Sequence, residues 1–246
     1  MSLLAGHLNH IVQTMPYNNV EPLFQRIGRE TLKFGGSCVQ QQRELAALIR
    51  KNGHRKVQHL VADQTNHTVS IVRDGSMIDV LDTSFRMVEP AVLDDKFHNE
   101  RAQTRAYPTT GEMSHVVRFE RRKELIKEQL IVSIENREEV VLKTELLRLD
   151  RATEQLPDLE TDIDTIRKEG SILIMAVVAG NVVQLRVQTD GTMSLKPSNG
   201  PRIRPSSPER FYPLFDAIAA INGGTRDQLH GYLDEGMSML TQELAA

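Results

Sequence analysis

The chain has 246 residues, of which 39% are hydrophobic and 26% are charged, and its formal net charge is −3. This composition is typical of a globular protein, and the absence of a basic excess argues against nucleic acid as a partner. One cysteine excludes an internal disulfide and a multi-cysteine metal cage. Without a signal-peptide pattern or a membrane-length apolar run, we expect a cytoplasmic protein with no membrane partner.

The first part of the chain has a helical pattern. Residues 39–52, VQQQRELAALIRKN, are strong helix formers with an apolar stripe at Leu45, Leu48 and Ile49. The sequence FGGS at residues 34–37 predicts a turn into this helix, with Ser37 as its N-cap.

From residue 57 onward the pattern changes to short β-branched runs that indicate strands. These runs are VQHLVA, HTVSIVRD, SMIDVLD, HVVRFE, LIVSIE and EVVLKTELL. Residues 90–111 have the composition of a polar connection that is rich in turns. Residues 150–170 are acidic and poorly patterned, which indicates a linker or a short helix.

The last third begins with two strand-like runs, SILIMAVVAG and VVQLRVQTDG, which we expect to join as a hairpin near Gly180 and Asn181. A loop rich in Pro, Ser and Arg follows at residues 196–208. Two helices, at about residues 209–221 and 225–240, are expected to complete the chain.

A hairpin in the strand region brings a histidine to an aspartate. Asp74-Gly75 is a strong signal for a two-residue type I′ turn, which would place His67 opposite Asp82. It would also pair Val69 with Val80, Ile71 with Ile78 and, on the other face, Ser70 with Asp79. Directly opposed side chains have Cβ atoms roughly 4.5–5.5 Å apart, so the imidazole and the carboxylate are expected to form a hydrogen bond. A surface His–Asp pair is the alternative interpretation.

Cys38 is predicted to lie in the first turn of the helix that follows the FGGS turn. Free backbone N–H groups and the positive end of the helix dipole favour a thiolate at such a position, and the same N–H groups can stabilise an oxyanion. With His67 as base and Asp82 as the acid that orients it, Cys38 would be an activated nucleophile. A buried structural cysteine is the alternative.

The order and context of these residues resemble the arylamine N-acetyltransferase family, whose catalytic core is related to transglutaminases and papain-like enzymes. Three segments carry the resemblance: HIVQTMPYNNV at residues 10–20, FGGSCVQQQ at residues 34–42, and the span from His67 to the DTSF sequence at residues 82–85. Phe34, Gln40 and Gln42 stand where the family motif has arginine, glutamate and asparagine.

The resemblance implies an α+β fold of three domains. These are a helical domain at residues 1–55 with the nucleophile, an antiparallel β-barrel at residues 56–150 with His67 and Asp82, and a C-terminal α/β lid at residues 151–246. It also implies a Cys38–His67–Asp82 triad that moves an acyl group from a thioester donor to a small amine. The donor would be an acyl-coenzyme A or an acyl carrier protein thioester, used as cosubstrate, with no permanently bound cofactor.

Two alternative functions stay open. A cysteine hydrolase or deamidase would use the same three residues, whereas a non-catalytic binding protein would not use them for catalysis. In a coenzyme A-dependent enzyme, Lys196, Arg202 and Arg204 would meet the donor phosphates, although a solvated basic loop is the simpler interpretation. His54 and His59 lack metal-ligand spacing, so we predict no metal site.

Overall fold

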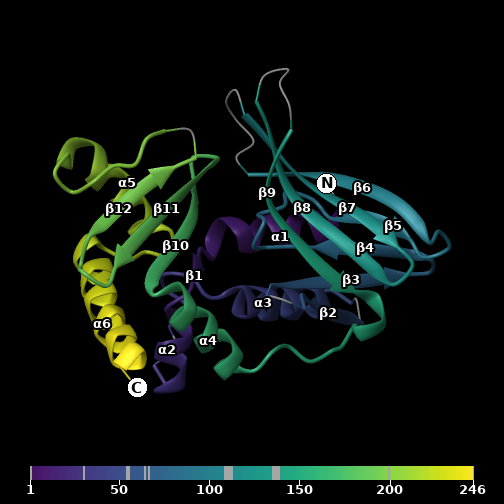
Figure 1. Cartoon of the computed structure of the whole chain (residues 1–246), viewed down its shortest axis with the longest axis horizontal. Helices are drawn as coiled ribbons and strands as arrows, with labels where there is room; N and C mark the ends of the chain where they lie inside the picture. The colour runs from purple at the N-terminus through teal and green to yellow at the C-terminus, as the bar shows by residue number, and fades with distance from the viewer. Residues whose placement is uncertain are drawn as a thin grey trace. The chain divides into compact units, whose positions relative to one another are not determined.

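The computed structural model describes residues 2–29, 31–53, 56–63, 65, 67–107, 113–134, 139–198 and 200–245. Within these ranges the chain is a mixed α+β protein with three antiparallel sheets and six α-helices (Figure 1). It divides into two compact units, one formed by Met1–Val12 and Cys38–Pro157 and the other by Gln13–Ser37 and Asp158–Ala246. Each unit thus combines an N-terminal segment with a later part of the chain, and the predicted division into three domains stays a prediction.

The first unit contains two four-stranded sheets. One has the order β2-β3-β4-β5 and the other the order β6-β7-β8-β9. Helix α3 (Cys38–Lys51) packs against β2 and β3, and α1 (Leu3–Thr14) begins in the same unit. The strands are β2 (Val57–Val61), β3 (Thr68–Asp74), β4 (Met77–Leu81), β5 (Ala91–Asp94), β6 (Asn99–Ala106), β7 (Met113–Arg122), β8 (Leu125–Ile134) and β9 (Val140–Arg148).

The expected closed β-barrel is not found in the part of the chain that the structure describes. Strands β5 and β6 follow each other in sequence, but each is the edge of its own sheet, so no continuous ladder joins the two sheets. Both strands lie in the region 90–111, which the sequence analysis interpreted as a connection. Strand β6 is a polar edge strand with mostly exposed or half-buried side chains, which explains why it has no apolar alternation.

The hairpin of β3 and β4 forms with a pairing shifted by two residues from the expected one. Asp74 pairs with Met77 and Ile71 with Val80, so Gly75 and Ser76 are the central residues of the turn. Gly75 has a φ of +58°, whereas Asp74 does not have the positive φ that a type I′ turn at Asp74-Gly75 requires. The shift moves Ser70 opposite Leu81 rather than Asp79.

A shift by two residues keeps every side chain on its predicted face, because side chains alternate with a period of two. The predicted shared face of β3 and β4 is therefore confirmed, and all of its members are buried: His67, Val69, Ile71, Ile78, Val80 and Asp82. Continued past the ends of the two strands, the observed pairing places His67 and Asp82 diagonally and not directly opposite each other.

The second unit contains a sheet with the order β1-β10-β11-β12 and four helices around it (Figure 1). Its apolar core includes Phe211, Phe215, Ile172 and Leu185. Its elements are β1 (Tyr17–Asn18), α2 (Glu21–Arg26), α4 (Leu159–Glu169), β10 (Ser171–Val178), β11 (Asn181–Gln188), β12 (Met193–Pro197), α5 (Pro208–Ala220) and α6 (Arg226–Ala245). The remaining element, a 3₁₀ turn at Leu149–Arg151, ends the strand region of the first unit.

The acidic stretch at residues 150–170 and the turn near Gly180 both have a definite structure. The acidic stretch forms α4, which begins at an Asp158 N-cap that accepts the Thr161 N–H and ends at Gly170 with a φ of +58°. The hairpin of β10 and β11 turns at Ala179 and Gly180, both with positive φ, so Asn181 begins β11 rather than forming the turn.

Candidate functional site

His67 is fixed immediately before β3. Its backbone N–H donates to Thr65 Oγ1 at 3.2 Å, and its carbonyl oxygen accepts the Ala62 N–H at 2.9 Å. The imidazole packs against the Phe85 ring, with 4.8 Å between the centroids. The side chain is 2% exposed, so this histidine is part of the interior and not of a polar surface.

Asp82 follows β4 and forms a turn with its own backbone. The N–H of Ser84 donates to Asp82 Oδ1 at 2.6 Å, and the N–H of Phe85 donates to Oδ2 at 3.0 Å. Such a turn is a common local conformation of aspartate. It directs Oδ2 toward His67 Nε2 at a distance of 3.5 Å. The structure therefore brings His67 and Asp82 together, as the sequence predicts.

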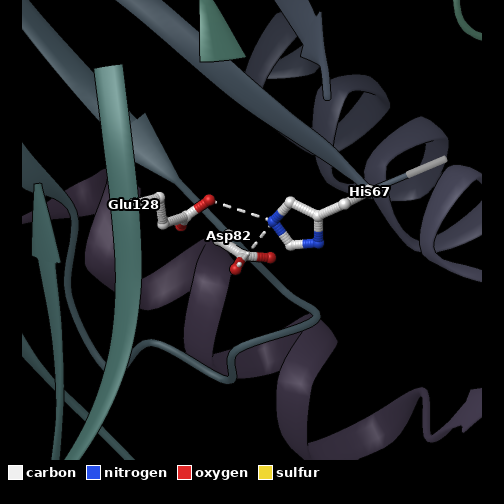
Figure 2. A group of neighbouring side chains, drawn as sticks. All are labelled: His67, Asp82 and Glu128. Carbon is white, nitrogen blue, oxygen red and sulfur yellow. Dashed lines mark hydrogen bonds and ion pairs between the residues drawn. The ribbon is translucent and has the colours of Figure 1, made fainter. Parts of the chain in front are cut away.

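A third residue, Glu128 of β8, completes the cluster. Its Oε2 lies 3.0 Å from His67 Nε2, closer than the Asp82 carboxylate, and the side chain is fully buried. Figure 2 shows both acids on the Nε2 side of the imidazole, with the other ring nitrogen pointing away from them. Glu128 was not among the residues predicted from the sequence. The available signal was an acid on the same face as buried Ile126, two residues earlier on the strand.

Burial shifts all three groups toward their neutral forms. It raises the pKa of Asp82 to about 7, an effect that the His67 charge opposes and Glu128 reinforces. It raises the pKa of Glu128 to about 8. It lowers the pKa of His67, against the attraction of Asp82. When Asp82 is ionised, its carboxylate only accepts hydrogen bonds, and the neutral imidazole then has its proton on Nε2 and its lone pair on Nδ1.

Strand β9 adds a second pair of charges near the cluster. Lys143 Nζ lies 2.9 Å from Glu145 Oε1 and 5.6 Å from the centroid of the Phe85 ring. Thr65, which also holds the His67 backbone, donates to Glu145 Oε2 at 2.8 Å. The segment before β3 is thus tied to β9 at the same end as the cluster.

Cys38 is the first residue of α3 and is half-buried. Its predicted place at a helix start is confirmed. Its thiol is not among the ligand atoms of His67, Asp82 and Glu128 that lie within 4.8 Å of one another. The ring nitrogen left for a thiol is Nδ1, because both acids lie at Nε2. A contact between Cys38 and Nδ1 stays a prediction.

One turn after Cys38, Gln42 anchors α3 to the sheet. Its side-chain amide donates to the Leu81 carbonyl at 3.3 Å and to Thr83 Oγ1 at 3.2 Å, and its Oε1 accepts the Ser70 hydroxyl at 2.6 Å. Ser70 is three residues after His67, and Thr83 directly follows Asp82. The start of α3 is therefore anchored at the end of the sheet that holds the cluster.

A second buried histidine belongs to this anchor rather than to the cluster. His59 Nδ1 lies 3.1 Å from the Ser70 hydroxyl. Burial lowers the pKa of His59 to about 4, and the nearby Arg50 charge adds to the effect. His59 is thus a neutral hydrogen-bonding residue of the interior at physiological pH. His54, which the sequence analysis considered with it, lies outside the described residues.

The predicted coenzyme A residues belong to the second unit. Lys196 lies on β12, and Arg202 and Arg204 flank Ile203, whose backbone pairs with Leu195. All three basic side chains are exposed. Their role in binding phosphate stays a prediction.

The cluster also has the composition of a metal site, because a histidine and two carboxylates form a common ligand set. Within the described ranges, His67, Asp82 and Glu128 form the one group of three such side chains with ligand atoms this close. Each oxygen of Asp82 already accepts a backbone N–H, and Nε2 is at hydrogen-bond distance from Glu128. Hydrogen bonds occupy part of the bonding capacity of these atoms, and the expected absence of a metal stays a prediction.

No protein-family model matches the chain, and no curated protein matches it. Among the helices that the structure describes, none combines the length and the apolar character needed to cross a membrane.

Proposed function

We propose that this chain is an N-acyltransferase that carries the acyl group on Cys38. The observation that carries the proposal is the buried His67 ring, whose Nε2 is held by Asp82 at 3.5 Å and Glu128 at 3.0 Å. An imidazole with Nε2 fixed by acids has Nδ1 as its basic atom, the arrangement that activates a neighbouring nucleophile. The order Cys38, His67, Asp82 and the resemblance to arylamine N-acetyltransferases supply the nucleophile.

The chemistry begins with transfer of the Cys38 thiol proton to His67 Nδ1. The thiolate attacks the carbonyl carbon of the thioester donor, and N–H groups at the start of α3 stabilise the oxyanion. Collapse of this intermediate breaks the donor carbon–sulfur bond, and the imidazolium returns its proton to the departing thiolate. An amine then attacks the acyl-enzyme and loses a proton to His67. The bond between the acyl carbon and Cys38 Sγ breaks, and the imidazolium returns the proton to the Cys38 thiolate.

The proposed donor is an acyl-coenzyme A or an acyl carrier protein thioester, and the proposed acceptor is a small amine. Lys196, Arg202 and Arg204 are the proposed phosphate contacts of the donor, on the basis of their exposed positive charge. Asp82 orients His67 and stabilises its imidazolium form.

Intact-mass spectrometry after mixing with acetyl-coenzyme A tests the proposal. We expect one acetyl group on the wild-type chain, none on C38A, and strongly reduced labelling of H67Q. The exposed His98 offers a matched control, and H98Q is expected to label like the wild type. Loss of the adduct only when an amine is added supports transfer, whereas rapid loss in buffer supports a hydrolase. If no thioester donor transfers an acyl group to the Cys38 thiol, both enzymatic functions are contradicted and a binding role is supported.

A further inference from the structure

The acid nearest to His67 is Glu128, which has no counterpart in the predicted triad. Its Oε2 lies 3.0 Å from His67 Nε2, whereas Asp82 Oδ2 lies 3.5 Å from the same atom. Both side chains are fully buried. Two acids thus compete for one N–H donor, and two adjacent carboxylates in the interior cannot both carry a negative charge without a large cost.

The surroundings decide which acid is ionised. Asp82 accepts two backbone N–H groups, from Ser84 and Phe85, which stabilise its negative charge. Glu128 Oε1 is buried without a hydrogen-bond partner among the described residues. An unpaired oxygen is much less costly in a neutral acid than in a carboxylate. The geometry therefore favours a neutral Glu128 beside an ionised Asp82.

The other charges around Glu128 have opposite effects on its ionisation. Burial raises the pKa of Glu128, a hydrogen bond with Asp82 opposes this effect, and Glu145 and Lys143 of β9 also act on it. The Glu145 charge disfavours ionisation of Glu128, and the Lys143 charge favours it. Lys143 is committed to an ion pair with Glu145 at 2.9 Å, so the two largely cancel at Glu128.

We propose that Glu128 is a positioning residue of the thiol reaction, which acts as a neutral acid that holds His67 Nε2 beside the ionised Asp82 and keeps Nδ1 as the basic nitrogen. This inference rests on the proposed function for its chemical meaning. When Nδ1 takes the Cys38 proton, one imidazolium then faces one carboxylate, and the net charge of the buried cluster changes from −1 to zero. The Nε2 proton and the Glu128 proton stay in place throughout the reaction.

The substitutions E128Q and E128L test the proposal against D82N. Glutamine reproduces the shape and hydrogen-bonding oxygen of a neutral glutamic acid, whereas leucine removes the contact at similar volume. Two quantities are measured: the protonated nitrogen of His67, from long-range ¹H–¹⁵N NMR with assignment by H67Q, and the pH profile of Cys38 alkylation by iodoacetamide. The first quantity does not depend on any acyl donor.

We expect E128Q to keep the Nε2-protonated ring and an alkylation rate within about threefold of wild type. We expect E128L to lose about 10–100-fold in rate, the equivalent of one hydrogen bond to a charged group, and to show a mixture of ring tautomers. E120Q is the matched control, an acid of the neighbouring strand β7 that pairs with Arg101 on the opposite face of the sheet, and it should leave the tautomer unchanged.

Two results overturn the inference. If E128L retains the wild-type tautomer and pH profile, Glu128 does not position the ring. If E128Q is as damaging as D82N, the negative charge of Glu128 is required and the neutral assignment is wrong; this comparison needs only these two isosteric variants to fold. Failure of the acyl-transfer proposal is distinct, because it leaves the wild-type thiol without an acetyl adduct whatever tautomer the variants show.

Discussion

Replacement of Asp82 by asparagine is the most direct test of the His67 geometry. In the wild type, both Asp82 oxygens accept backbone N–H groups, and Oδ2 also faces His67 Nε2. An asparagine has one oxygen and one NH₂ group, so one of these three donors must face another donor. In either orientation the amide carries no negative charge, so it cannot stabilise the imidazolium, and Nδ1 becomes a weaker base for the thiol proton.

The magnitude follows from the distance. For unit charges 3.5 Å apart, an effective dielectric constant of about 20 gives an attraction of about 5 kcal/mol between the imidazolium and the carboxylate. That energy corresponds to a fall of about 3 to 4 units in the pKa of His67 and to a rate loss of about 10³–10⁴. The same order of loss is known for the equivalent change in serine proteases.

The assay is the rate of Cys38 alkylation by iodoacetamide between pH 5 and 9. Since the pKa of Asp82 is raised by burial to about 7, the wild-type rate should rise as pH increases through this value, as the carboxylate forms. D82N should lose this rise and react only at the pH of an ordinary thiol. D79N is the matched control, because Asp79 lies on the same strand with the opposite parity. A wild-type profile for D82N would refute the assigned role of Asp82.

Three further predictions concern stability. G35A should destabilise the protein by more than about 2 kcal/mol in urea unfolding, because Gly35 has a φ of +99° and an added Cβ would overlap the Pro16 carbonyl. Q42A should cost about 1–3 kcal/mol, because it leaves buried partners of Gln42 unpaired. E128Q should become more stable than the wild type as pH rises from 4.5 to about 8, by about 1.4 kcal/mol per pH unit, measured by urea unfolding at several pH values.

Each of these predictions has its own control. Gly28 also has a positive φ, +73°, but a Cβ there meets no atom within 4 Å, so G28A should cost less than G35A. For Q42A, the control is S70A, which removes the partner of Gln42. If the losses of unfolding free energy in the two single variants add up in the double variant, a shared hydrogen-bond network is contradicted. For Glu128, the folded pKa is above the unfolded one, so the native state binds more protons and loses stability as pH rises. A constant stability difference between E128Q and wild type would show that Glu128 has an ordinary pKa in the folded protein.

Local patterns predicted the parts of the site that depend on local structure. Strand alternation placed His67 and Asp82 on one face, and a pairing error of two residues did not matter because parity was preserved. Helix signals placed Cys38 at the start of α3. The turn was misplaced because Asp74-Gly75 fits a type I′ turn, whereas the chain uses Gly75 as the first central residue, a position that glycine also favours.

Long-range pairing determined what the sequence did not reveal. Glu128 reaches His67 from a different sheet, and nothing within β8 specifies that partner. Strand β6 forms through its ladder to β7 despite its polar side chains, and β5 pairs with β4 after a turn. The division of the chain at Ser37 and Cys38 has a similar origin, because Tyr17 and Asn18 pair with β10 far along the chain.

The composition of the buried cluster argues for a chemical role. Stability alone would be served better by apolar side chains, because burying ionisable groups usually costs more than their mutual attraction returns. Here two acids and an imidazole are fully buried, and one oxygen of Glu128 is unpaired within the described structure. Such clusters of perturbed groups are concentrated at functional sites. A packing role predicts that D82N combined with E128L stabilises the fold without affecting Cys38, whereas the proposed role predicts that any gain in stability is accompanied by a loss of thiol reactivity.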